Sequence, residues 1–339
     1  MRLLVTGGAG FIGSNFVRYW RNEHPSDDLE VLDALTYAAN PENIAGMQVP
    51  LHHVDLRDAA ATSACMRLVQ PHVIVHFAAE SHNSLAVLDP SLFFQTNVIG
   101  TQNLLEAARN QGIERFHHVS TCEVYGDMDL DDSTPAFTET SPYRPRTPYN
   151  ASKAGADHAV RCYGETYELP FTISNCANNY GPYQFPEKVL PLFVTRALQN
   201  ADIPVYASSD HRREWVHALD HCSAIDRILN DGKAGETYHV GTGFERSVTQ
   251  IADAVFEHIP ETQSQRVSVP DRPGHDRRYL LDSSKITREL GWRPSIEWGT
   301  GVAETIEWYR SNRAWWEPLL ERAPVFEDRW ISQSGVDPS

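Results

Sequence analysis

The sequence predicts an α/β fold in which a doubly wound parallel sheet is followed by a smaller C-terminal α/β domain. Short apolar runs typical of buried strands alternate with segments of helical length through the first half of the chain. The first run ends in a glycine-rich turn, and after about residue 178 prolines cluster at Pro182, Pro186 and Pro191. We therefore expect a first domain at residues 1–178 with returning segments near 213–241, a second domain mainly at 179–320, and a tail at 321–339.

Strands and helices alternate along the predicted first domain. Strands are predicted at residues 2–6, 29–32, 49–54, 72–77, 115–120 and 171–175. Helices are predicted between them at residues 11–21, 59–69, 101–110 and 150–167. Further along, residues 236–240 have the composition of a strand that returns to the first sheet, residues 249–259 favour a helix, and residues 271–292 are expected in the second lobe.

Composition narrows the class of protein. The formal net charge is −16, from 29 Lys and Arg against 45 Asp and Glu, which argues against a nucleic-acid partner. A polyanionic substrate would therefore need locally placed basic residues. The chain has no apolar run of membrane-spanning length, and its N-terminal apolar run is shorter than that of a signal peptide, so we expect a cytoplasmic protein. Five widely spaced cysteines without a CxxC pair argue against disulfides or zinc.

A glycine-rich turn indicates the cofactor. The first predicted strand runs directly into Gly7-Gly8-Ala9-Gly10-Phe11-Ile12-Gly13, and a helix follows. This spacing lets the backbone approach a pyrophosphate, which the helix N-terminus then faces. Asp33 ends the next strand, at the spacing of the carboxylate that binds the adenosine ribose of NAD rather than NADP. Asp55 ends the third strand, where it would meet the adenine. Together these residues predict a Rossmann-like domain that binds NAD.

A tyrosine and a lysine indicate redox chemistry on an alcohol. Tyr149 and Lys153 are four residues apart at the start of a long predicted helix, so they share one face. A cation beside a phenol favours the phenolate, and we expect the pKa of Tyr149 to be lowered towards neutrality. Such a tyrosine takes a hydroxyl proton while the carbon loses hydride. Ser120 and Thr121 end the preceding strand, where a hydroxyl would hydrogen-bond the substrate oxygen.

Longer motifs carry a resemblance to a known family. GGAGFIG, FAAESH, TNVIGT, Ser120-Thr121 and Tyr149-x-x-x-Lys153 resemble the extended short-chain dehydrogenase/reductases. FTETSPYRPRTPYNASKAGAD, NNYGPYQFPEKVLP and DRPGHDRRYLLDSSKITRELGW resemble the dTDP-glucose 4,6-dehydratase branch. The resemblance covers roughly residues 1–319. It implies a Rossmann domain, a small substrate domain and a homodimer formed through two helices of the larger domain.

The resemblance implies ligand contacts at matching positions. The implied NAD contacts are Gly7, Gly10, Phe11, Ile12, Gly13, Asp33, Asp55, Leu56, Ala78, Ala79, Asn97, Tyr149 and Lys153. The implied contacts to a nucleotide-diphosphate hexose are Ser81, His82, Asn179, Glu187, Lys188, Val189, Arg213, His239, His275, Arg277 and Tyr279. Arg213 would supply the local positive charge that the acidic composition makes necessary.

The resemblance also implies a three-step lyase reaction, with Thr121, Cys122, Glu123, Tyr149 and Lys153 as the catalytic residues. Tyr149 deprotonates O4 of the hexose while C4 gives hydride to NAD. Glu123 removes the C5 proton, which the new ketone acidifies, and water leaves from C6. The hydride returns to C6 and gives a 4-keto-6-deoxy sugar.

Cys122 departs from this pattern. The family has an aspartic acid here, which protonates the departing hydroxyl, and a thiol with a pKa near 8.5 is a weaker donor than a carboxyl near 3.9. The Thr121-Cys122-Glu123 triplet resembles the UDP-N-acetylglucosamine 5,6-dehydratase of tunicamycin biosynthesis, which returns the hydride to C4 and leaves a 5,6 double bond. Both outcomes stay open from the sequence. Asn83-Ser84-Leu85 in place of Val-Asp-Arg, with changes at Ala34 and His239, leaves the base and sugar open too.

Three rival functions share part of this pattern. A nucleotide-sugar 4-epimerase shares the cofactor site with Tyr149 and Lys153, but it has no need for Glu123. A non-catalytic NAD-binding protein would tolerate loss of Tyr149 or Lys153, and both are present. A metal enzyme is weakly indicated by His217 and His221, four residues apart, but the sequence offers no evident third ligand.

Overall fold

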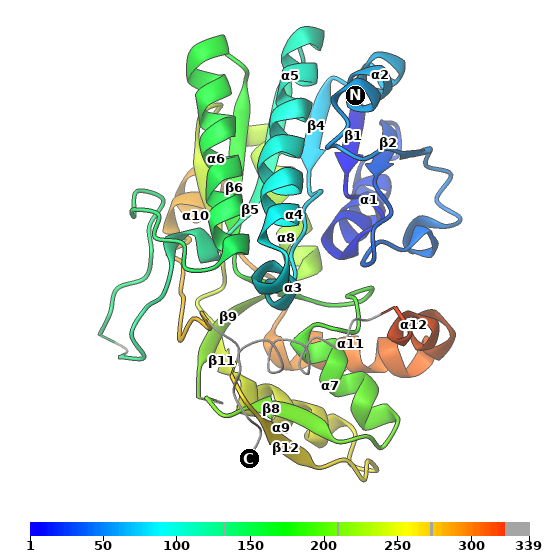
Figure 1. Cartoon of the computed structure of the whole chain (residues 1–339), viewed down its shortest axis with the longest axis vertical. Helices are drawn as coiled ribbons and strands as arrows, with labels where there is room; N and C mark the ends of the chain where they lie inside the picture. The colour runs from blue at the N-terminus through cyan, green and yellow to red at the C-terminus, as the bar shows by residue number, and fades with distance from the viewer. Residues whose placement is uncertain (132, 209, 272–273, 323–339) are drawn as a thin grey trace.

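The structure is a computed structural model that describes residues 1–131, 133–208, 210–271 and 274–322. Most of the tail predicted at residues 321–339, from residue 323 onward, therefore lies outside the described residues. A larger α/β body carries the N-terminus, and a smaller lobe of helices and short strands packs against one end of it (Figure 1).

Seven parallel strands form the main sheet, in the order β10-β6-β5-β4-β1-β2-β3. Their bounds are β1 (Arg2–Thr6), β2 (Asp28–Asp33), β3 (Leu51–His53), β4 (Val73–His76), β5 (Arg115–Thr121), β6 (Phe171–Cys176) and β10 (Thr237–Val240). From β1 the chain proceeds outward first through β2 and β3 and then, in the other direction, from β4 onward. The loops that follow β1 and β4 therefore diverge, and a crevice opens at the carboxyl ends of these strands.

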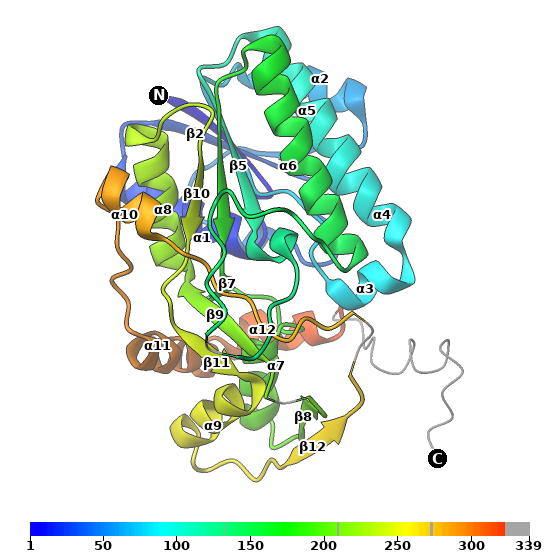
Figure 2. The same ribbon diagram turned by 90° about the vertical axis from the view of Figure 1, so that its left-hand side faces the viewer.

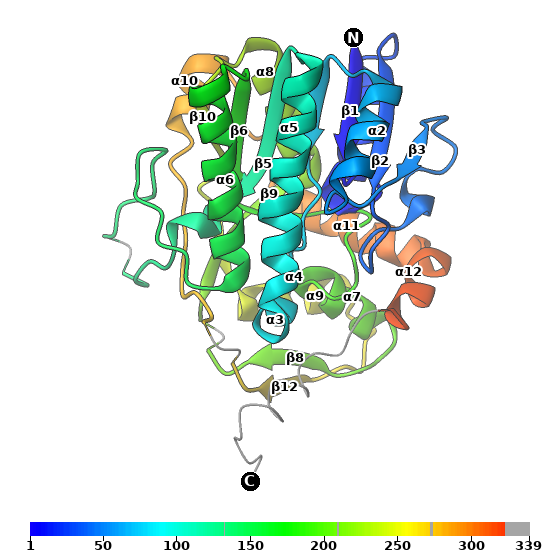
Figure 3. The same ribbon diagram turned by 45° about the horizontal axis from the view of Figure 1, so that its top comes forward.

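Helices cover both faces of the main sheet (Figures 2 and 3). On one face, α1 (Phe11–Glu23) and α8 (Ala218–Asp231) bury Phe16, Trp20 and Ile225 against β1 and its neighbours. On the other face, α2 (Ala59–Val69), α5 (Thr101–Gln111) and α6 (Pro148–Tyr167) pack over Leu4 and Ile74. The sequence prediction of a parallel sheet with helices on both sides is confirmed.

Short elements at the carboxyl ends of the strands shape the crevice. They are η1 (Pro41–Ile44), α3 (Asn83–Leu88), α4 (Pro90–Phe94), the π-helical turn η2 (Gln95–Gly100) that leads into α5, and η3 (Cys122–Tyr125). The sequence analysis did not predict them, because each is too short for a helical periodicity to show.

The smaller lobe has its own core around Trp215, Tyr309 and Trp316. Its helices are α7 (Val189–Leu198), α9 (Val248–His258), α11 (Trp298–Ser311) and α12 (Arg313–Leu320). Its strands are β7 (Asn178–Tyr180), β8 (Ile203–Tyr206), β9 (Arg212–His217), β11 (Glu245–Ser247) and β12 (Arg266–Val269), which form a sheet of order β11-β9-β7 and the pair β12-β8.

One segment lies in a different body from the one expected. Residues 271–292 were predicted in the second lobe, but their helix α10 (Ser284–Leu290) packs on the larger body. Ile286 and Trp292 are buried against Ile228 of α8 and Tyr238 of β10. The Trp292 Nε1 also donates a hydrogen bond to the Ser223 Oγ at 2.9 Å. Burial of these large apolar side chains draws the segment to the main sheet.

Within the described residues, no helix is long and apolar enough to cross a bilayer. All five cysteines carry free thiols, four of them buried.

Candidate active site

A cavity of about 780 Å³ lies at the carboxyl ends of the sheet strands, between the two bodies. The larger body contributes the loops after β1, β2, β3, β4, β5 and β6 to its wall. The smaller lobe contributes residues of α7, β8, β9 and β12. A ligand that spans the cavity would therefore touch both bodies.

The turn after β1 is built so that the backbone lines the cavity. Gly7 has a φ of +71°, and a Cβ there would lie 2.6 Å from the Ala78 amide nitrogen. A Cβ at Gly13 would lie 2.2 Å from the Gly7 carbonyl oxygen. Any larger residue at either position would push β1, β4 and the start of α1 apart. The predicted set Gly7, Gly10, Phe11, Ile12 and Gly13 all lies on the cavity wall, at the N-terminus of α1.

Two carboxylates follow the next strands. Asp33 is buried, and its carboxylate accepts hydrogen bonds from the Ala9 amide at 2.9 Å and the Leu35 amide at 2.8 Å. Burial raises the pKa of Asp33, while these backbone hydrogen bonds oppose the rise. Asp55 is held by the Arg57 guanidinium, whose hydrogen bonds lower the pKa of that carboxyl. Both line the cavity, as do Leu56, Ala78 and Ala79.

Lys153 and Tyr149 lie on the same wall, one turn of α6 apart. The Lys153 ammonium donates a hydrogen bond to the Val119 carbonyl oxygen at 2.8 Å. The expected lowering of the Tyr149 pKa is wrong. Burial raises that pKa well above its usual value, and the nearby Glu123 carboxylate raises it further. With Lys153 as its neighbouring cation on the helix, the phenol of Tyr149 is therefore neutral near pH 7.

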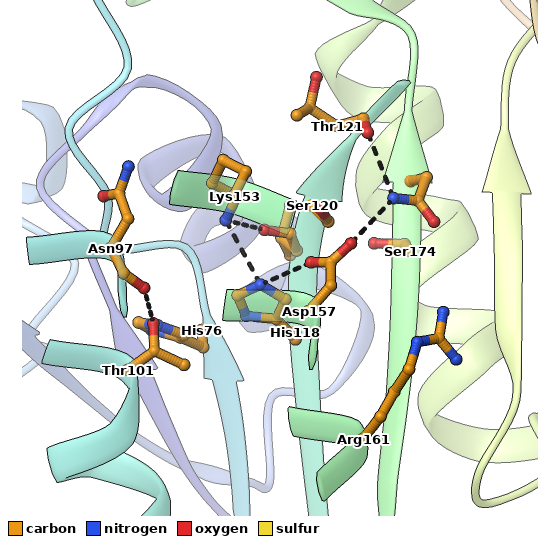
Figure 4. A network of polar contacts seen from close by, with 12 residues as sticks. His76, Asn97, Thr101, His118, Ser120, Thr121, Lys153, Asp157, Arg161 and Ser174 are labelled. Carbon is orange, nitrogen blue, oxygen red and sulfur yellow. Dashed lines mark hydrogen bonds and ion pairs between the residues drawn. The ribbon is translucent and has the colours of Figure 1, made fainter. Parts of the chain in front are cut away.

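A buried polar network on the side away from the cavity holds Lys153 in place (Figure 4). The His118 Nε2 on β5 lies 3.4 Å from the Lys153 Nζ and 3.2 Å from an Asp157 oxygen on α6. Burial, with the charge of Lys153, lowers the pKa of His118 to about 4, so the imidazole is neutral near pH 7. Burial opposes ionisation of Asp157, but hydrogen bonding from His118 and the charge of Lys153 lower its pKa below the usual range. Lys153 and Asp157 thus form a charge pair around a neutral histidine.

Glu123 enters the cavity from η3, directly after β5. Its backbone amide donates to the Thr121 Oγ1 at 3.2 Å, so the strand-end threonine orients the turn. One carboxylate oxygen, Oε2, accepts a hydrogen bond from the Asn83 Nδ2 at 3.2 Å. Thr121, Glu123 and Tyr149 share one part of the wall, which is the arrangement expected for proton transfer to and from a bound hydroxyl and its neighbouring carbon.

Cys122 does not share that wall. Its side chain is fully buried in a cluster with Val124, Ala154 and Tyr279, and it is absent from the described cavity lining. Burial raises the pKa of the thiol well above its usual value. The catalytic role predicted for Cys122 has no support in this geometry, because the η3 turn directs its side chain into the protein and that of Glu123 into the cavity.

The smaller lobe closes the other side of the cavity. Glu187 accepts a hydrogen bond from the Tyr37 hydroxyl at 2.8 Å and lies 3.5 Å from the His82 Nε2. Lys188 donates to the Ser81 carbonyl oxygen at 3.0 Å, which ties the two bodies together. These residues and Val189 line the cavity as predicted.

Basic side chains line the part of the cavity that the smaller lobe supplies. Arg213 lies 4.8 Å above the Tyr279 ring, and Arg213 and Arg246 are directly paired across the antiparallel strands β9 and β11. Directly paired residues point to one side of a sheet, and both arginines line the cavity together with His275 and Tyr279. This is the local positive charge that the acidic composition led us to expect.

Asn179 also lines the cavity, but its amide is engaged within the protein. Its Nδ2 donates to the Ala177 carbonyl oxygen at 3.0 Å, and its Oδ1 lies 2.9 Å from the His221 Nδ1. His217 caps α8 by accepting from the Leu219 amide. Among the described residues no cluster of three metal-binding side chains occurs, so the structure offers no metal site that uses His217 and His221.

Three further predicted contacts lie outside the described cavity lining. Asn97 is buried and bridges the Glu80 backbone and the Ser152 hydroxyl. His239 is fully buried, 2.7 Å from the Tyr125 hydroxyl. Arg277 pairs at the surface with Asp127 and Asp129, both at 2.7 Å. In each case the side chain forms a polar contact within the fold, and its contact with a ligand stays a prediction.

Several wall residues escaped the sequence analysis. Tyr37 is fixed by Glu187, and Glu80 lies within the FAAESH motif, where it was given no role. Arg246 lies beside Arg213 through a strand pairing that no periodicity reveals. Asn83 was noted as a departure from the family pattern without a role. The departure from the family's Val-Asp-Arg sequence, directly after the FAAESH motif, was the sequence feature that could have drawn attention to Asn83.

Comparisons with known proteins agree along nearly the whole chain. A family model described as GDP-mannose 4,6 dehydratase matches residues 4–305. The dTDP-glucose 4,6-dehydratase of Shigella flexneri is 43% identical over 98% of this chain and 99% of its own, and that of Mycobacterium tuberculosis H37Rv is 45% identical over 95% and 97%. The crystal structure of DesIV, a dTDP-glucose 4,6-dehydratase from Streptomyces venezuelae with NAD bound, is 48% identical and superposes with a TM-score of 0.89 over 94% of this chain and all of that one.

The Lys153–Asp157 pair predicts a large stability effect. Asp157→Asn removes the charge that compensates a fully buried ammonium, and we expect the free energy of unfolding to fall by about 3 kcal/mol. Urea denaturation followed by circular dichroism measures it. Glu106→Gln is the matched control, because it breaks a half-exposed ion pair with Arg109 that contributes less than about 1 kcal/mol. Equal losses in the two variants would contradict the pairing.

A double variant separates charge from packing. If the two charges are coupled, Lys153→Met costs less stability in the Asp157→Asn background than in the unmodified protein. Additive losses would show that the two side chains act independently.

Proposed function

The chain belongs to the family described as GDP-mannose 4,6 dehydratase, and from this membership we propose that it is an NAD-dependent nucleotide-sugar 4,6-dehydratase, a lyase that makes a 4-keto-6-deoxy sugar. The observation that carries the proposal is a single cavity in which Thr121, Glu123 and Tyr149 lie with the glycine turn of a dinucleotide site. Its substrate is proposed to be dTDP-glucose, the sugar named for the relatives that match nearly the whole chain.

The residues present fit NAD. The turn after β1 would receive the pyrophosphate at the N-terminus of α1, where a side chain on Gly7 or Gly13 would collide with backbone. Asp33, with its carboxylate already oriented by two amides, would bind the adenosine ribose. When bound, NAD accepts the hydride from C4 of the sugar, returns it to C6, and brings a positively charged nicotinamide to the wall that carries Tyr149.

The substrate's two ends require different surroundings. We place the diphosphate against Arg213 and Arg246, because two paired guanidinium groups can neutralise its charge in an acidic protein. We place the hexose against Thr121, Tyr149 and Glu123. The first oxidation then requires Tyr149 to take the O4 proton, and Lys153 on the same helix face stabilises the resulting charge.

One carboxyl serves both proton transfers of the elimination in this proposal. Glu123 takes the C5 proton once C4 is a ketone, and the same carboxyl, now protonated, donates to the departing C6 hydroxyl, which leaves as water. A proton that derives from solvent then adds to C5 when the hydride returns to C6. This follows because Cys122, at the position of the family's acid, is buried away from the cavity with a raised pKa. The 5,6-dehydratase and 4-epimerase alternatives are not favoured, since the relatives cited above are 4,6-dehydratases.

The product tests the reaction directly. Incubation with dTDP-glucose in D₂O is expected to give a C6 methyl signal in the proton NMR spectrum, with deuterium at C5. Exocyclic vinyl protons would instead identify a 5,6-ene and overturn the 4,6 assignment. UDP-glucose and UDP-N-acetylglucosamine in parallel test the base and the sugar.

Glu123→Gln is expected to lower turnover about 10²- to 10⁴-fold while NAD binding is retained.

The burial of Cys122 gives a second prediction. Cys122→Ala is expected to keep kcat within about threefold of the unmodified enzyme, because a buried neutral thiol transfers no proton in the reaction. Steady-state kinetics on the same sugar measures kcat, and circular dichroism checks the fold. A loss of 100-fold or more in a folded variant would assign the acid role to the thiol.

We also propose a homodimer formed through helices of the larger body. α5 and α6 lie side by side on one face (Figures 2 and 3), and exposed Phe94 and Ile99 precede α5 while exposed Tyr167 ends α6. Light scattering is expected to give twice the chain mass of 38.2 kDa. A monomer at micromolar concentration would refute it.

A further inference from the structure

Asn83 bridges two catalytic elements that are distant in sequence. It is the first residue of α3 and lines the cavity. Its Nδ2 donates to the Glu123 Oε2 at 3.2 Å, and its Oδ1 accepts from the Thr147 hydroxyl at 3.1 Å. Because an ionised carboxylate only accepts hydrogen bonds, the amide nitrogen must face Glu123 and the amide oxygen must face Thr147.

The second partner fixes the bridge to the catalytic helix. Thr147 is the N-cap of α6, where its Oγ1 accepts a hydrogen bond from the Asn150 amide at 3.2 Å. Tyr149 lies in the first turn of that helix. A continuous line of hydrogen bonds therefore runs from the Glu123 carboxylate through Asn83 to the start of α6.

The other groups near Glu123 do not replace this donor. The titratable side chains coupled to its charge are Cys122, Tyr149, Cys176 and Tyr279, and burial raises the pKa of each, so all four are neutral near pH 7. The Arg213 guanidinium lies over the Tyr279 ring and donates to the backbone carbonyls of residues 276 and 277. Among the described residues, the Asn83 amide supplies the side-chain hydrogen bond to the Glu123 carboxylate.

We propose that Asn83 is a positioning residue for Glu123. This inference rests on the proposed dehydratase function and adds a determinant within the same site. By engaging Oε2, the amide fixes the plane of the carboxylate that accepts the C5 proton. Oε1 then faces the proton in transfer. The line of hydrogen bonds also holds Glu123 at a constant position relative to Tyr149, so the O4 and C5 proton acceptors address one bound hexose.

The test compares pH profiles of kcat on dTDP-glucose. In Asn83→Asp, a second carboxylate faces Glu123, and two neighbouring carboxylates share a proton until the pH is raised. The acid limb of the profile is expected to move upward by about one pH unit or more, with partial recovery of kcat at high pH. Asn110→Asp is the matched control, because it makes the same change on an exposed residue of α5, and its profile should coincide with that of the unmodified enzyme.

Asn83→Val supplies a second variant that adds no charge. It removes both hydrogen bonds, and kcat is expected to fall about tenfold with KM changed less than threefold, because the substrate-binding arginines are untouched. An unchanged kcat in folded Asn83→Val, or an acid limb unmoved in folded Asn83→Asp, would overturn the positioning role. If the unmodified enzyme forms the C6 methyl product while either variant gives that negative result, the positioning role fails and the proposed function stands. If the unmodified enzyme forms no such product, the proposed function itself fails.

Discussion

The buried contact between α6 and β5 sets the geometry on which the site depends. Lys153 on α6 donates to the Val119 carbonyl of β5, and Asp157 one turn later faces His118 of the same strand. A charge pair without solvent tolerates little displacement, because moving either partner leaves an uncompensated buried charge. The pair therefore fixes the register of the helix against the strand, and with it the position of Tyr149 relative to Glu123, which follows the end of that strand.

The site fixed by this register is one end of a single ligand cavity that both lobes line. The larger body supplies the backbone turn and the proton-transfer groups, while the smaller lobe supplies Arg213 and Arg246 at the opposite end. Neither body encloses the cavity alone. In this acidic protein, strand pairing brings two arginines to one side of a short sheet, and this local positive charge is where we propose that the diphosphate binds.

The features predicted correctly from the sequence are those that depend on periodicity or on the spacing of residues close together in the chain. The alternation of strands and helices and the GxxGxxG turn depend on neighbours along the chain, and the structure has both. Side-chain direction depends on distant partners. Arg277 stands two residues before Tyr279 in a family motif, yet it pairs at the surface with Asp129 and with Asp127, which is 150 residues away in sequence. His239 and Asn97 are likewise engaged by Tyr125 and Ser152. Arg246 was missed for the opposite reason, because its pairing with Arg213 is invisible locally.

The η3 turn shows why a motif match and a role must be separated. Cys122 and Glu123 are adjacent, but a turn directs successive side chains to different sides, so one is buried beneath Tyr279 and the other enters the cavity. Replacing an acid by a thiol at the buried position removes a charge that would be costly there and leaves the cavity with one carboxyl beside Tyr149. In the proposed mechanism that carboxyl is first a base and then an acid, so its orientation matters more than in a site with two acids. The Asn83 amide is placed to supply that orientation.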